Sequence, residues 1–77
     1  MSINKKLSML ESHRKFLGIT QNDLGVLLGC GRSNYCLKEQ GKSEISLTQM
    51  IKIQKAFNEK RELIEMQPLK LDEIFLS

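Results

Sequence analysis

Two cysteines and one histidine are the side chains of this sequence that metal binding or nucleophilic catalysis would use. Cys30 and Cys36 lie six positions apart, and His13 is the single histidine. A zinc site needs more ligands and a disulfide framework needs more cysteines, so we expect two free thiols, no metal and no cofactor. The sequence also lacks paired carboxylates, a cysteine–histidine arrangement or a phosphate-binding loop whose members would meet. It therefore argues against an enzyme, and no small-molecule ligand is evident.

A second set of polar side chains offers hydrogen bonding instead of covalent chemistry. Arg32, Ser33 and Asn34 follow the glycine-containing turn Gly29-Cys30-Gly31, at the point where a helix is expected to begin. Arginine, serine and asparagine can all hydrogen-bond the base edges that B-DNA exposes in its major groove. Polar residues at a helix start are also ordinary capping residues, so their types alone leave both interpretations open.

The turn lies between two expected helices. Thr20 can cap the first of them, which runs to Leu28, because Asp23 occupies the third helical position of a capping box. The second helix is expected from Arg32 to Gln40, where Gly41 ends it. Two short helices joined by a three-residue turn with glycine form a helix-turn-helix unit, and the second helix of such a unit fits the major groove.

The remaining sequence also predicts helices. Ser46 and Gln49 form a second capping box, and apolar residues recur at helical spacing in each expected segment. In chain order these segments are about Asn4 to Leu17, Ser46 to Asn58, more helix from Glu59 to Met66, and, after an interruption at Gln67-Pro68, a short piece from Leu71 to Leu76. Leu69-Lys70-Leu71 alternates and would pair only weakly as a strand, so we expect an all-α fold.

Length and composition limit the possible functions. The chain has 77 residues, 40% of them apolar, which suits one soluble domain without room for a large active-site cleft. The longest apolar runs are three residues, and the N-terminus lacks the apolar segment of a signal peptide. We therefore expect no membrane partner and a cytoplasmic location.

Charge divides the chain into two parts. Residues 1–58 carry nine basic and four acidic residues, a net charge of +5, whereas residues 59–77 carry three basic and five acidic residues, a net charge of −2. A surface for a polyanion therefore belongs to the first four helices. We interpret residues 1–58 as a helix-turn-helix domain and residues 59–77 as a helical extension used for packing and dimerisation.

Several motifs together resemble the Cro/C1 or XRE-type helix-turn-helix family, which has the lambda-repressor-like fold. The resemblance covers about residues 14–58 and includes Thr20-Gln21, the turn glycines, Glu39-Gln40-Gly41-Lys42 and Ser46-Leu47. The closing segment Leu71-Asp72-Glu73-Ile74-Phe75 is similar to the family's Leu-Asp-x-Leu-Phe. The resemblance implies a five-helix, lambda-repressor-like bundle that contains a helix-turn-helix.

The resemblance also implies roles for individual residues. Arg14 and Glu39 match a family pair that ties the first helix to the third. Tyr35 stands where the family has Ile or Val, so its hydroxyl needs a partner or access to solvent. Leu37 and Lys38 exchange the polar and apolar residues that the family usually has there. The implied base-contacting residues are Arg32, Ser33, Asn34 and Leu37, and the implied phosphate-contacting residues are Gln21, Lys42 and Ser43.

The function that these observations predict is sequence-specific binding of double-stranded DNA by a transcriptional regulator. We expect a homodimeric repressor of phage, mobile-element or toxin–antitoxin type, because a single helix-turn-helix contacts too few bases for useful specificity. The alternative is a protein-interaction module on the same fold, which would use Tyr35, Leu37 and the apolar tail to bind another regulator. The exchanged Leu37 favours the alternative, whereas Arg32, Lys42 and the charge of residues 1–58 favour DNA.

The acidic tail carries more apolar side chains than a short segment hides alone. Eight large apolar residues fall within positions 63–76. We expect part of them to pack on the first and fourth helices and the rest to form a two-fold interface made by Leu71, Ile74, Phe75 and Leu76. The other possibility is that all eight close the core of a single subunit.

Overall fold

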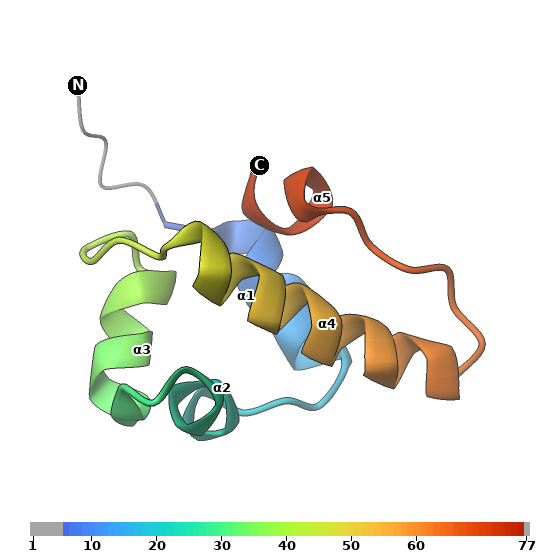
Figure 1. Cartoon of the computed structure of the whole chain (residues 1–77), viewed down its shortest axis with the longest axis horizontal. Coiled ribbons are helices and arrows are strands. Elements are labelled where there is room, and N and C mark those ends of the chain that lie inside the picture. The colour runs from blue at the N-terminus through green and yellow to red at the C-terminus, as the bar shows by residue number, and fades with distance from the viewer. Residues whose placement is uncertain (1–5, 77) are drawn as a thin grey trace.

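The structure, a computed structural model, describes residues 6–76 and contains five α-helices over that range (Figure 1). They are α1 (Ser8–Phe16), α2 (Gln21–Leu28), α3 (Gly31–Glu39), α4 (Leu47–Leu63) and α5 (Leu71–Phe75). No strand occurs among the described residues, so the expected all-α fold is confirmed there, and the Leu69–Leu71 segment forms no strand.

Local hydrogen bonds fix the starts of α2 and α4 where the sequence predicts them. The Thr20 hydroxyl accepts from the Asp23 amide at 3.0 Å, and the Asp23 carboxylate accepts from the Thr20 amide at 2.9 Å. Ser46 and Gln49 make the same reciprocal pair, with both distances at 3.1 Å. Each box satisfies two of the donors that a helix start leaves unpaired.

Two helices, α1 and α4, differ from their expected bounds by more than one residue. Helix α1 begins only at Ser8, after Leu7 as its N-cap, while the predicted start at Asn4 lies outside the described residues. Helix α4 passes through Asn58 without a break and ends at Leu63. Asn58 does not end the helix because its side chain bonds the segment after α4: Nδ2 donates to the Leu69 carbonyl at 3.1 Å, and Oδ1 accepts from the Leu69 amide at 2.7 Å.

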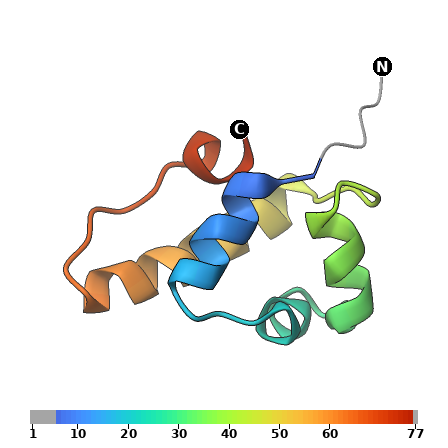
Figure 2. The same cartoon turned by 180° about the vertical axis from the view of Figure 1, so that it is seen from behind.

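One apolar core joins all five helices. Helix α2 packs on α3 and α4, and α1 packs on α3 and α5 (Figures 1 and 2). The buried apolar side chains come from every helix and from the segments before α2 and α5; they are Leu10, Ile19, Leu24, Tyr35, Ile53, Phe57, Leu69, Ile74 and Phe75. The C-terminal segment therefore belongs to the same core that holds α2 and α3 in place.

The C-terminal segment returns over the bundle and places α5 against α1 and α4. Arg61, near the end of α4, fixes the start of this segment by donating from Nε to the Gln67 carbonyl at 2.7 Å. Packing on α1 and α4 agrees with the prediction, but the predicted dimer interface needs correction. Ile74 and Phe75 are buried inside their own subunit, because α5 packs against α1 and α4, and Leu71 is half-buried; of the four predicted residues only Leu76 is largely exposed.

Candidate nucleic-acid interface

The α2–α3 unit is held together by an unusually close approach of the two backbones. A Cβ atom on Gly25, in the middle of α2, would lie 2.5 Å from the carbonyl carbon of Gly31 and 2.8 Å from the amide nitrogen of Arg32. Glycine is therefore required for this crossing. The sequence analysis missed Gly25, although a glycine inside an apolar helix costs about 1 kcal/mol relative to alanine and so indicates a packing reason.

The turn between the helices uses glycine for a different reason. Gly29 ends α2 with φ of 70°, and Gly31 begins α3 with φ of 83°. Both values lie in the left-handed region that other residues adopt only at a cost. The expected three-residue turn is therefore present, with Gly31 already counted in α3.

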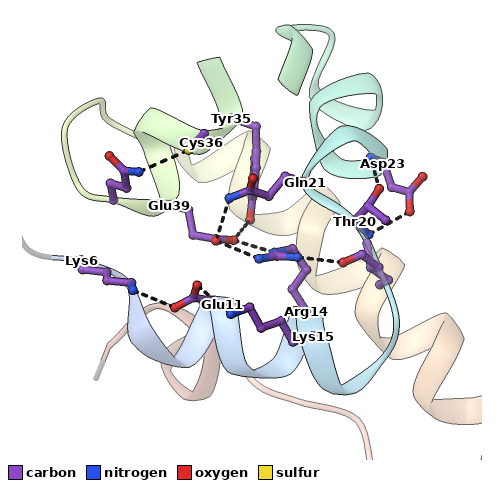
Figure 3. A network of polar contacts seen from close by, with 12 residues as sticks. Lys6, Glu11, Arg14, Lys15, Thr20, Gln21, Asp23, Tyr35, Cys36 and Glu39 are labelled. Carbon is purple, nitrogen blue, oxygen red and sulfur yellow. Dashed lines mark hydrogen bonds and ion pairs between the residues drawn. The ribbon is translucent and has the colours of Figure 1, made fainter. Parts of the chain in front are cut away.

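The buried carboxylate of Glu39 connects α1, α2 and α3 through hydrogen bonds (Figure 3). Glu39 accepts two hydrogen bonds from Arg14, from Nε at 2.8 Å and from Nη2 at 3.0 Å, so the predicted pair is present. It also accepts from the Tyr35 hydroxyl at 2.8 Å and from Gln21 Nε2 at 3.3 Å. The remaining Arg14 group, Nη1, donates to the Ile19 carbonyl at 3.0 Å. Helix α3 is thus fixed to α1 and to the start of α2.

Two groups of this network, Arg14 and Tyr35, are held in their protonated forms. The side chains of Arg14 and Glu39 are only 8% and 2% exposed. The hydrogen bonds that Arg14 donates to Glu39 raise the pKa of its guanidinium. Burial, with the hydrogen bond to Glu39, holds the pKa of the Tyr35 hydroxyl well above its ordinary value, so the hydroxyl stays a donor. The structure thereby supplies the partner that the sequence analysis required for Tyr35.

The predicted base-contacting residues lie together at the start of α3 and along its outer side. Arg32, Ser33 and Asn34 are all exposed, and Leu37, one turn beyond Ser33, is 42% exposed. Asn34 bonds back to the helix start, because its Nδ2 donates to the Cys30 carbonyl at 2.9 Å. Lys38 is half-buried and donates from Nζ to the Glu44 carbonyl at 2.7 Å, so α3 presents Leu37 to solvent.

The predicted phosphate-contacting residues lie in two places, the loop after α3 and the start of α2. Lys42 and Ser43 are exposed in the loop that follows the helix. Gln21, at the start of α2, donates from Nε2 to Glu39 and lines a hollow of about 560 Å³ with Lys15, Asn22 and Arg32. Glu11 lies at the edge of this hollow and pairs with Lys15 at 3.2 Å. Basic groups therefore flank the exposed side of α3 at both ends.

The other candidate chemistry of the sequence is not assembled into a site. Cys30 and Cys36 are free and half-buried. Residues 6–76 bring no cluster of metal-ligating side chains together. Within the same range no helix combines the length and apolar composition that crossing a lipid bilayer requires.

Comparison of the chain with protein-family models, with curated proteins and with solved structures gives no match.

Proposed function

We propose that the protein is a sequence-specific, double-stranded DNA-binding transcriptional regulator that represses as a homodimer, with its helices arranged as in the lambda-repressor-like fold. It would act in the cytoplasm on an operator of a phage, mobile element or toxin–antitoxin locus. One observation carries the proposal: α3 exposes Arg32, Ser33 and Asn34 at its start, while its opposite side is locked to α1 and α2 through Glu39. A fixed helix with a free polar side is what base recognition in the major groove requires.

The dimensions of α3 suit the groove. The helix has 9 residues, and an α-helix with its side chains is about 10–12 Å across, which fits a major groove about 12 Å wide. With α3 in the groove, Arg32 at its start would lie near one backbone, and Lys42 and Ser43 after its end near the other, while Gln21 would contact phosphate from the start of α2. Phosphate contacts on both sides would set the register in which α3 contacts the bases.

Charge supports the same orientation. Residues 1–58 carry the net positive charge, and α5, which carries Asp72 and Glu73, lies on the other side of α4 from α2 and α3 (Figure 1). The basic side attracts DNA, and the acidic tail is kept away from it. Repression would follow from occupancy of an operator that overlaps a promoter.

A second candidate is the protein-interaction module. The exposed Leu37 in the middle of the outer side of α3 favours it, because an apolar side chain there suits a protein partner as well as the methyl group of thymine. Tyr35 does not favour it, since that side chain is fully buried.

Binding to the DNA upstream of the protein's own coding sequence tests the proposal. In a gel shift at about 100 mM salt, we expect a complex that survives an excess of unrelated duplex. A complex no stronger than that with unrelated duplex would contradict sequence-specific regulation and favour the second candidate.

Arg32→Ala is expected to reduce discrimination among operator variants by about 1–3 kcal/mol, because a bidentate contact to guanine is lost. Competition titrations against single-base operator variants measure the effect. Lys70→Ala, which removes an exposed charge before α5, is the control and should keep the wild-type order of affinities. If Arg32→Ala leaves relative affinities unchanged, α3 does not contact bases in the way proposed.

Lys42→Ala is expected to weaken binding to all sequences about equally and to reduce the slope of log affinity against log salt by about one, as loss of one phosphate contact does. Titrations at several salt concentrations give the slope. An unchanged slope would place Lys42 away from the DNA.

A further inference from the structure

The outer side of α4 carries a pattern of charge that the fold does not use. Four exposed charged residues lie on it: Lys52 and Lys55 in the first half, and Glu59 and Glu62 in the second. The exposed apolar residues Ile51 and Leu63 lie at its two ends, 48% and 80% exposed. At about 100° per residue, these six side chains fall within about 120° of the helix circumference. That arc lies opposite the side that buries Ile53 and Phe57.

The pattern is self-complementary. Lys55 and Glu59 lie two positions on either side of Phe57, Lys52 and Glu62 lie five positions away, and Ile51 and Leu63 lie six positions away. An antiparallel copy of α4 centred at Phe57 therefore places each lysine opposite a glutamate and each apolar end opposite the other. In a two-fold contact every such pair occurs twice.

Interactions within one subunit do not account for this pattern. In the part of the chain that the structure describes, the ion pairs involve Lys6, Glu11, Arg14, Lys15 and Glu39, and none of the four α4 charges. Lys55 precedes Glu59, which is the less favourable order for a pair four residues apart in a helix. Glu62 lies in the last turn, where the helix dipole disfavours an acid.

We propose that this α4 face, defined by Ile51, Lys52, Lys55, Glu59, Glu62 and Leu63, binds the same face of a second copy in an antiparallel, two-fold contact. The need for two copies rests on the proposed function, whereas the place of the contact follows from the self-complementary pattern on α4. It replaces the α5 interface expected from the sequence, because Ile74 and Phe75 are buried within the subunit.

The arrangement is compatible with binding of one duplex. A two-fold axis that makes two α4 helices antiparallel runs perpendicular to both of them, in the plane of contact between them. Rotation about this axis does not change the position of an element along it. Helices α2 and α3 lie on one side of α4 and α5 on the other (Figures 1 and 2), so the two α3 helices stay on the same side of the dimer.

The contact is small, which sets its expected strength. Helix α4 has 17 residues, so its length is about 25 Å. Shallow grooves on both sides of the face add apolar surface from Leu27 and Ala56 on the α2 side and from Met66 and Pro68 on the other. We expect association in the micromolar range that weakens with salt, strengthened on DNA when two half-sites bind the two copies together.

Sedimentation of the full chain without DNA tests the contact through a charge swap. K52E/K55E makes all four charged positions of the face acidic, and E59K/E62K makes them all basic. Each variant alone is expected to dimerise at least about tenfold more weakly than wild type, because like charges then face each other. An equimolar mixture of the two is expected to recover a dimer, since every pair is then opposite in charge.

Two controls separate this face from general effects of charge. K42E/K70E changes the net charge by the same amount as K52E/K55E at exposed positions outside the face, and it should dimerise like wild type. Circular dichroism should show both swap variants folded, because acids early and bases late in α4 suit the helix dipole better.

Three outcomes would overturn the proposal: a wild-type chain that is monomeric at about 200 µM, well above the expected range, swap variants that dimerise like wild type, or a mixture that stays monomeric. Because the assay contains no DNA, a failure here leaves the gel shift to decide the proposed function separately. A DNA-binding protein that fails this test would have another dimer contact or none.

Discussion

Arg14→Ala is expected to lower the free energy of unfolding by about 3–5 kcal/mol. The substitution leaves the Glu39 carboxylate buried with only Tyr35 and Gln21 as partners, and it leaves the Ile19 carbonyl without the Arg14 donor. A small domain has about 5–15 kcal/mol in total, so the variant loses a large part of its stability. Chemical denaturation followed by circular dichroism measures the change.

A double-variant cycle distinguishes a lost pair from a lost side chain. Arg14→Met with Glu39→Gln removes both charges but keeps groups of similar size, so its cost should be smaller than the sum of the two single costs, with a coupling of about 1–3 kcal/mol. Lys15→Ala removes an exposed ion pair next to Arg14 and should change stability by less than about 1 kcal/mol. An Arg14→Ala denaturation curve that matches that of wild type would show that the buried pair contributes nothing to the free energy of unfolding.

The predictable parts of the fold are those that depend on neighbours in sequence. The starts of α2 and α4 followed from capping boxes, in which a side chain bonds a backbone amide three residues away. Asn58 shows the opposite case. An asparagine in a late helical position commonly ends a helix, but here its partner is Leu69, and only the folded chain brings the two together.

The C-terminal segment shows why the dimer interface was not predictable. Hydrophobic residues in a short segment indicate burial, but the count does not say whether the burial is within one subunit or between two. Ile74 and Phe75 proved to fill the subunit's own core. The self-complementary pattern of α4 became recognisable only once the structure showed which of its sides is exposed.

At the candidate site, residue types were more predictable than their partners. The exposed start of α3 and the Arg14–Glu39 pair were expected from the sequence and its resemblance. The Tyr35 hydroxyl at the same carboxylate was not, because a buried partner four residues away looks no different in sequence from a solvated one. The role of Gly25 was not expected either, because the backbone of Gly31 comes close to it only in the folded chain.

Gly25→Ala is expected to destabilise the protein by about 3 kcal/mol, at the upper end of the cost of adding one methyl group to a packed interior. The sign is the informative part. Alanine in a helix is about 1 kcal/mol more favourable than glycine, so α2 considered alone predicts a gain. The structure predicts a loss because the new Cβ would lie 2.5 Å from backbone atoms of Gly31, which cannot move without displacing α3.

Gly29→Ala is the matched control for this substitution. Nothing lies within 4 Å of a Cβ at Gly29, so its cost should be the roughly 1–2 kcal/mol of a left-handed backbone alone. Folded Gly29→Ala should then keep its order of operator affinities, whereas folded Gly25→Ala should lose affinity because α3 has shifted relative to the phosphate contacts of α2. A Gly25→Ala variant that melts above wild type would show that helix propensity outweighs the close contact, and that the α2–α3 crossing does not depend on glycine.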